Sequence, residues 1–266
     1  MAKLNKISDK MNKTTYKILF SLLISIVYLQ TIKAENADTL FQQANTEYKN
    51  SNFQKSIELY EQIVSEGYSS SELYFNLGNA YYKANNLPYA ILNYERAKLI
   101  RPNDEAINYN LQLVNTFKVD QIEEIPEFFV KEWFSSLVLW KSYEIWSYTS
   151  VISFFMVIIC ILLFLFSGKT KLKKLSFVFA ILLFVVSTTT FILAHKRYNI
   201  QTTKDKAIIT VSTVTTKSSP DESGNDLFVL HEGTKVNIED KVGDWLEVKI
   251  SDGNKGWIHS ENLEII

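Results

Sequence analysis

The clearest binding chemistry in this 266-residue chain lies in asparagine and lysine side chains that recur at a fixed spacing. Asn45 precedes Asn79 by 34 positions (79 − 45 = 34), and Lys49 precedes Lys83 by the same interval. An asparagine side chain can bond both an N–H and a C=O of an extended peptide, and a lysine can meet a carboxylate. The pattern predicts a peptide-binding groove. Its candidate residues are Asn45, Tyr48, Lys49, Asn76, Asn79, Tyr82, Lys83 and Asn110.

A structural interpretation of the same residues stays open. Tyr48 and Tyr82 are large enough to be packing residues, and the two lysines can form the solvated face of a helix.

A second candidate surface lies near the C-terminal end of the sequence. Along residues 245–250 polar and apolar side chains alternate, which places Trp245 on the polar face of a strand. The candidate residues of this surface are Phe228, Trp245, Trp257 and His259. The alternative interpretation is that both tryptophans pack inside a small β domain.

No pattern in the sequence supports catalysis, a cofactor or a metal. His195, His231 and His259 have no further His or Cys at metal-ligand spacing, and Cys160 is the single cysteine. There is no glycine-rich phosphate loop and no nucleophile elbow. The formal net charge of −1 gives no reason to expect nucleic-acid binding. We therefore expect a binding protein and not an enzyme.

Residues 37–70 and 71–104 are predicted to be two copies of an antiparallel helix pair. In the second copy, the small residues Gly78 and Ala90 fall where the two helices touch, and Pro102 stops the second helix because it lacks the N–H needed to continue. The spacing resembles the tetratricopeptide repeat, which implies an all-α solenoid that binds other proteins. We assign residues 35–120 to this domain, with a closing helix over 105–119.

The chain departs from the tetratricopeptide pattern at three points. Ser56 stands where the family usually has alanine, and the first copy ends in Gly67 and not in proline. The carboxylate-binding pattern of the family is also not reproduced, which argues against a C-terminal carboxylate as ligand.

Residues 203–266 change to short alternating segments that are typical of β-strands. The predicted strands are 207–211, 227–230, 235–239, 245–250 and 256–258. Gly233, the pair Asp244-Trp245 and the pair Gly256-Trp257 resemble a bacterial SH3-like domain. This resemblance implies an all-β SH3-like barrel that binds cell-wall peptides or other proteins.

The first apolar run, residues 18–29, predicts export. Lysines precede it and the small residue Ala34 follows it, which favours a secretory signal peptide over residues 1–34. An uncleaved signal anchor stays open, as does a start at Met11 in place of Met1.

Residues 145–167 and 175–195 are each close to the ~20 residues that cross a bilayer as a helix. The loop between them, residues 168–174, is short and basic. The positive-inside rule keeps such a loop in the cytoplasm and places both flanks outside. The alternative is a helical hairpin buried in a soluble protein.

Residues 121–144 form the predicted interfacial linker. Phe129, Trp133 and Leu137 recur at four-residue spacing, which predicts a short helix lying on the outer leaflet. A helix that packs against the end of the repeats explains the same pattern.

The order of these parts resembles the BatE-like aerotolerance-operon proteins of bacteria. The sequence then describes a multidomain membrane protein: an all-α tetratricopeptide solenoid, a two-helix transmembrane hairpin and an all-β SH3-like barrel. The resemblance implies a protein of the inner (cytoplasmic) membrane with both soluble domains in the periplasm. It also implies von Willebrand A-type membrane proteins and a MoxR-type AAA+ ATPase system as partners.

Two hypotheses of function follow from this organisation. The first is a scaffold for protein–protein interaction that binds its partners through the repeat groove. The second is a cell-wall protein that binds or senses peptidoglycan through the SH3-like domain.

Overall fold

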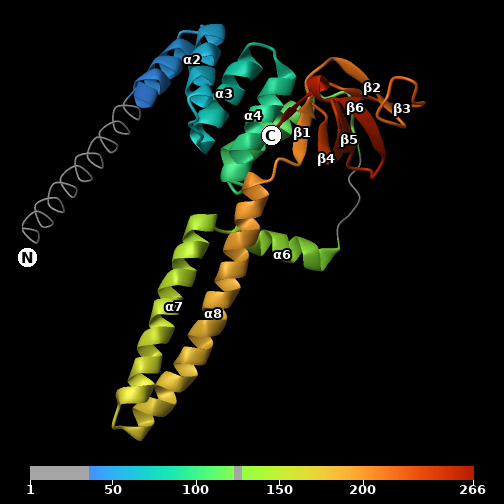
Figure 1. Ribbon diagram of the computed structural model, residues 1–266. Coiled ribbons are helices and arrows are strands. Elements are labelled where there is room, and N and C mark those ends of the chain that lie inside the picture. Colours follow the sequence, from blue (N-terminus) through green and yellow to red (C-terminus); the bar gives the residue numbers. More distant parts are fainter. Residues whose placement is uncertain (1–35, 123–127) are drawn as a thin grey trace, which may run out of the picture. The chain divides into compact units, whose positions relative to one another are not determined.

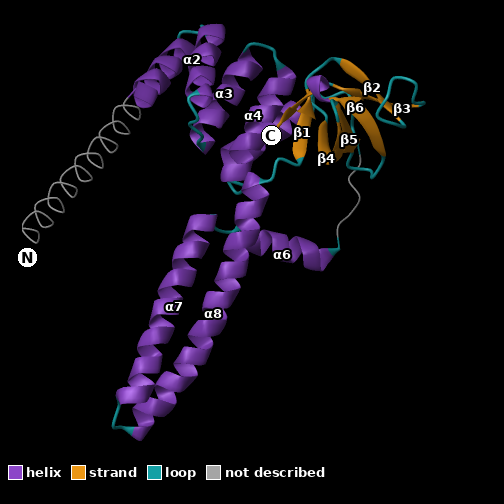
Figure 2. Cartoon of the chain, in the orientation of Figure 1, coloured by secondary structure: helices purple, strands orange, loops and turns teal. Residues whose placement is uncertain are grey.

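The computed structural model describes residues 36–122 and 128–266, and the chain divides into two compact units, Met1–Ser69 and Ser70–Ile266. Figures 1 and 2 show the elements of both units. The predicted signal peptide over residues 1–34 lies outside the described residues.

The first unit contains one helix pair. Residues 36–49 are helical, and α2 spans Phe53–Ser65. Between the two helices Ser51 has a φ of 64°, which closes a tight turn. Ser56, the residue that replaces the usual alanine, is fully buried, and its hydroxyl donates to the carbonyl oxygen of Ala44 at 2.9 Å. The serine therefore keeps the close helix contact, and its polar atom has a partner.

The second unit begins with the predicted complete repeat. It consists of α3 (Ser71–Lys83) and α4 (Leu87–Ile100), and the Ser70 hydroxyl accepts from the Leu73 N–H at the start of α3. At the contact between the helices, a Cβ added to Gly78 would stand 2.8 Å from the ring of Tyr94, which is fully buried. Glycine is thus required where the two helices approach.

The helix α5 (Glu105–Asn115) covers the open side of this pair. Asp104 caps its start by accepting from the Ala106 and Ile107 N–H groups. Leu111 and Val114 of α5 are buried in one cluster with residues of α4. This is the position expected for the closing helix.

Two long helices follow in sequence, α7 (Tyr143–Phe166) and α8 (Thr170–Thr202), and both are long and apolar enough to cross a membrane. They lie side by side (Figure 1), joined by a reciprocal pair of hydrogen bonds. The Ser150 hydroxyl donates to the Ser187 carbonyl oxygen at 2.9 Å, and the Ser187 hydroxyl donates to that of Ser150 at 3.0 Å. Their serines therefore face each other, while most of their apolar side chains point outward.

The observed helix α8 is longer than the predicted span of 175–195. It begins at Thr170, inside the predicted loop 168–174, because lysine and leucine are good helix formers. It also continues to Thr202, where Arg197 is fully buried. The Arg197 guanidinium donates to the carbonyl oxygens of Leu99 and Ile100 at 2.7 and 3.2 Å. Those two carbonyls lie at the C-terminal end of α4, where helix carbonyls lack intrahelical partners.

The short helix α6 (Phe129–Leu139) lies at the same end of the α7–α8 pair. Val138 of α6 is buried in one cluster with Trp146 of α7 and with Leu193 and Ala194 of α8. Figure 1 shows α6 running across these helices and not along them.

The C-terminal part of the chain is one antiparallel sheet in the strand order β3-β2-β6-β5-β4-β1-β7. The strands are β1 (Lys206–Ile209), β2 (Thr213–Lys217), β3 (Asp226–His231), β4 (Lys235–Val242), β5 (Trp245–Lys249), β6 (Lys255–His259) and β7 (Leu263–Ile265). Leu230, Val236, Val248 and Ile258 lie in its core. The sequence analysis missed β2 and β7.

The predicted closed barrel is wrong, because the sheet is open and has β3 and β7 at its edges. The β7 edge is covered by the repeat domain and not by another strand. The Ile265 carbonyl oxygen accepts from the guanidinium of Arg96 on α4 at 2.6 Å. A side chain of α4 is therefore hydrogen-bonded to a backbone carbonyl that a further strand would need in order to pair with β7 and close the sheet into a barrel.

The sheet and the repeat share a hydrophobic core. Ile208 of β1 is fully buried, and it belongs to the cluster formed by Ile91, Leu92 and Tyr94 of α4. The turn between β3 and β4 approaches the same helix. A Cβ on Gly233, which has a φ of +80°, would stand 2.7 Å from the Ile91 side chain.

Polar contacts complete this junction. Asp120 follows α5 and accepts three hydrogen bonds from the β3–β4 turn: from the His231 N–H at 2.8 Å, from its ring Nδ1 at 2.8 Å and from the Thr234 hydroxyl at 2.7 Å. Burial by itself would raise the pKa of Asp120, but these hydrogen bonds and the charge of His231 lower it below its ordinary value. Lys235 adds an ion pair of 2.6 Å with Glu95 of α4.

Substituting Asp120 tests this junction. We expect Asp120→Asn to weaken the attachment of the β3–β4 turn by roughly 1.5 kcal/mol, because bonds to a charged acceptor are lost. This corresponds to about tenfold less protection of the His231 amide in hydrogen exchange measured against intrinsic rates. Because the folded pKa of Asp120 is lowered, the wild type should keep this protection above the unfolded pKa of about 3.9 and lose it as the pH falls through the folded pKa.

The matched control is Asp226→Asn in the same sheet. Asp226 is exposed and pairs with Lys217, so this change should leave the His231 amide protected. Equal protection in the Asp120→Asn protein and the wild type at neutral pH would contradict the assignment.

Candidate binding surfaces

The first copy of the predicted groove lies in the unit Met1–Ser69. Asn45 is half-buried, and its side-chain oxygen accepts from the Tyr60 hydroxyl at 2.5 Å. The ring of Tyr48 lies 5.5 Å from that of Phe53, and burial raises the pKa of the Tyr48 hydroxyl. Lys49 is exposed. Two of the three candidates are thus in contact with α2, and the lysine faces solvent.

The second copy repeats this arrangement within the unit Ser70–Ile266. The Asn79 side-chain oxygen accepts from the Tyr94 hydroxyl at 2.7 Å and from the amide of Asn110 at 2.8 Å. Tyr60 and Tyr94 occupy equivalent positions, so each asparagine of the repeat is bonded to the tyrosine of the following helix. Asn79 and Asn110, both candidates for the groove, are in contact, and their hydrogen bond to each other uses part of the hydrogen-bonding capacity that we assigned to a peptide.

The rest of the second copy lies toward the C-terminal end of α3. Tyr82 is half-buried, Lys83 is exposed, and the ring of Tyr82 lies 6.4 Å from that of Phe117. Phe117 follows α5 and is 56% exposed, and the sequence analysis did not select it. The sequence feature that could have identified Phe117 is an aromatic residue soon after the closing helix. We call the surface formed by Asn76, Asn79, Tyr82, Lys83, Asn110 and Phe117 the α3–α5 face.

The predicted aromatic surface of the sheet is present in part. Trp245 of β5 and His259 of β6 are directly opposed in register, and their ring centroids lie 4.0 Å apart. Trp257 is opposed by Glu247 on one neighbouring strand and by Lys217 on the other. Since Leu246 and Ile258 point into the core, Trp245 and Trp257 lie on the outer face.

Phe228 does not belong to this outer surface. It packs against the core of the sheet together with Val214. Its backbone N–H and C=O both bond to the hydroxyl of Thr216, at 3.2 and 2.9 Å, which fixes β3 beside β2. The structure therefore separates Phe228 from the other three candidates of this surface.

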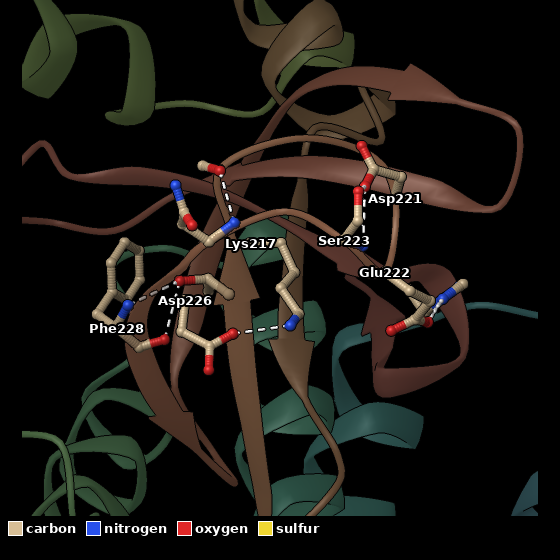
Figure 3. A network of polar contacts seen from close by, with 10 residues as sticks. Lys217, Asp221, Glu222, Ser223, Asp226 and Phe228 are labelled. Atoms are coloured by element: carbon tan, nitrogen blue, oxygen red, sulfur yellow. Dashed lines mark hydrogen bonds and ion pairs between the residues drawn. The ribbon is translucent and has the colours of Figure 1, made fainter.

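The loop between β2 and β3 carries a network of polar contacts (Figure 3), one of which reaches the aromatic surface. Glu222 of the loop lies 3.1 Å from Nε2 of His259. Ser223 and Ser219 donate hydrogen bonds that lower the pKa of Asp221, and the bond from Lys217 to Asp226 at 2.7 Å raises the pKa of Lys217. These contacts hold the loop in place, so the Trp245–His259 pair has a fixed acidic neighbour.

Among the described residues, no group of three or more His, Cys, Asp or Glu side chains is placed to hold a metal ion. The surfaces above offer aromatic rings, amides and single charges, which is chemistry for recognition of peptides or proteins.

Comparison with protein families gives two matches. The tetratricopeptide repeat model matches residues 71–104, and the bacterial SH3 domain model matches residues 214–264. Both predicted resemblances are thereby confirmed for these segments. No curated protein matches the chain. A tetratricopeptide repeat indicates interaction with other proteins, and a bacterial SH3 domain indicates binding to the cell wall.

Proposed function

We propose that this chain is a membrane-anchored scaffold of the bacterial envelope that binds partner proteins and catalyses no reaction. The observation that carries the proposal is that the sheet and the repeat share a core on α4, around the buried Ile208. The sheet covers one side of α4. The surface of the repeat that a partner protein binds is therefore the α3–α5 face.

The α3–α5 face has the mixed chemistry of a protein-binding surface. Tyr82 and Phe117 supply a partly exposed aromatic pair, and Lys83 adds a positive charge beside it. Aromatic residues within a polar surround are the residue types that contribute most to binding at protein interfaces. The amide of Asn110, on the same face, is held in position by Asn79.

The membrane part of the proposal rests on α7 and α8. Only 17% and 22% of the residues in their most apolar stretches are buried. A core helix of a soluble protein buries most of its apolar residues, whereas a membrane span exposes them to lipid. Lys169 lies in the turn between the helices, and Lys171, Lys173 and Lys174 lie at the start of α8, so by the positive-inside rule this end of the pair is cytoplasmic. The repeat and the sheet then lie on the periplasmic side of the inner membrane.

The finer part of the proposal concerns identity and partners. The order of modules resembles the BatE-like proteins, so we propose a stress or aerotolerance complex. Its expected partners are von Willebrand A-type membrane proteins and a MoxR-type AAA+ ATPase system.

A second candidate function is binding of peptidoglycan. The specific observation in its favour is the bacterial SH3 match together with the outer Trp245–His259 pair. This tilted aromatic pair beside the Glu222 carboxylate can hold a peptide that carries both an apolar group and an amine.

Photocrosslinking in living cells tests the scaffold proposal. A photoreactive residue at position 83 should capture partner proteins, and we expect von Willebrand A-type membrane proteins among them. The change Phe117→Ala with Lys83→Glu, crosslinked from position 109 on the exposed surface of α5, should reduce capture at least roughly tenfold. The reason is that truncating a central aromatic contact typically costs 2 kcal/mol or more.

The matched control is Val242→Ala with Lys241→Glu, an exposed apolar and lysine pair on the sheet. It should leave capture unchanged. If both double variants capture as well as the wild type, the α3–α5 face is not the binding site.

Sedimentation with purified peptidoglycan tests the second function. The detergent-solubilised full chain should sediment with the wall, and Trp245→Ala with His259→Ala should abolish most of the sedimentation. The Val242→Ala protein serves as the control. A full chain that stays in the supernatant eliminates the wall-binding function and leaves the scaffold proposal standing.

A further inference from the structure

The helix α6 exposes an unusual amount of apolar surface. Phe129 is 69% exposed, Trp133 is 67% exposed and Trp140, directly after the helix, is 61% exposed. Phe128, Val130 and Phe134 are exposed as well. A cluster of large apolar side chains of this kind marks an interaction site.

The C-terminal half of α6 is nevertheless held firmly. Val138 is 1% exposed and packs against Trp146, whose indole N–H donates to the Val138 carbonyl oxygen at 3.3 Å. The next carbonyl, that of Leu139, accepts from the side chain of Asn103 at 3.2 Å. Since Asn103 follows α4, the helix α6 is attached both to the long helices and to the base of the repeat.

The position of α6 along the long helices can be measured in residues. From Trp146, which contacts α6, to the last residue of α7, Phe166, there are 20 steps (166 − 146 = 20). From Lys173 in the basic segment to Leu193, which contacts α6, there are also 20 steps (193 − 173 = 20). At about 1.5 Å per residue each interval spans roughly 30 Å, the thickness of the hydrocarbon core of a bilayer.

We propose that α6 lies in the headgroup–acyl boundary of the bilayer, on the face opposite the basic turn, with its exposed aromatic side chains in lipid. This inference rests on the proposed crossing of the membrane by α7 and α8. Both helices independently place α6 one hydrocarbon thickness from the lysines. The occupant of the apolar surface is therefore lipid, because the surface continues directly from two helices that face lipid.

The residues that follow α6 in the sequence are also suited to the membrane–water interface. Trp140, Tyr143 and Tyr148 have rings with polar tips, which favour the membrane–water interface. The Lys141 ammonium lies 4.8 Å from the centre of the Trp140 ring, at the level where lipid phosphates would lie. Through Asn103 the base of the repeat is then held at the membrane surface.

Fluorescence quenching tests the proposal in the full chain, reconstituted into vesicles of phosphatidylcholine and phosphatidylglycerol. The difference between the wild type and Trp133→Phe isolates the emission of Trp133. Lipids brominated near the headgroup end of the acyl chain should remove most of this emission, and aqueous iodide should have little effect. The matched control is Trp245→Phe, whose difference signal should be quenched by iodide and not by the lipids.

Two results would overturn the proposal. Quenching of Trp133 by iodide alone places α6 in water, and quenching by neither agent places it against protein.

Labelling of Cys160 with a hydrophilic maleimide in the same vesicles distinguishes failure of the α6 placement from failure of the membrane crossing by α7 and α8. If Cys160, six residues before the end of α7 (166 − 160 = 6), is protected while Trp133 faces water, only the placement of α6 fails. If Cys160 reacts, the membrane crossing itself fails.

Discussion

The burial of Ile208 among residues of α4 and α5 is the contact on which the rest of the structure depends. Ile208 follows the two long apolar helices in the sequence, and α4 and α5 precede them. Segments in one core must lie on the same side of any membrane, so the chain between them can cross only an even number of times. The two helices α7 and α8 satisfy this requirement. If α7 crosses a membrane, the packing of the sheet on the repeat therefore requires α8 to cross back.

The helix α4 joins the three parts of this unit. Its aliphatic face is buried against α5 and β1, and Arg96 and Glu95 bond to the sheet.

 The Arg96 side chain donates to Ile265 of β7, and the Glu95 carboxylate pairs with Lys235 of β4. At its C-terminal end, the carbonyls of Leu99 and Ile100 accept from the buried Arg197 of α8. A cation at this position also interacts favourably with the helix dipole. These two hydrogen bonds, both from one Nη of Arg197, attach the C-terminal part of α8 to the repeat.

Much of this organisation could be predicted from the sequence, because it depends on the spacing of residues that are close together in the chain. Gly78 and Ala90 indicated a close helix contact, and the alternation around Trp245 indicated a strand with one buried face. The contacts that join distant segments could not be predicted in this way. Nothing in the vicinity of Asp120 indicates that it bonds to the β3–β4 turn 111 residues away. The open sheet has the same origin, since the Arg96 side chain that covers β7 belongs to the repeat.

The candidate binding residues likewise divide into those that local spacing could identify and those that depend on contacts between distant segments. The spacing of 34 residues identified Asn45 and Asn79 as equivalent, and the structure gives both the same partner, a tyrosine of the following helix. The spacing alone does not distinguish an asparagine that binds a peptide from one that bonds within its own repeat. Phe117 was missed because it lies beyond the repeat pattern, and Phe228 was misplaced because its side chain faces the core.

The account is tested most directly by labelling single cysteines from outside the cell membrane. In a Cys160→Ser background, cysteines are placed at Lys83 in the repeat, at Lys241 in the sheet and at Lys171 in the first turn of α8. Spheroplasts are then treated with a maleimide that does not cross membranes. The account expects positions 83 and 241 to react and position 171 to react only after lysis. Opposite outcomes at positions 83 and 241, or reaction at position 171 in intact spheroplasts, would contradict it.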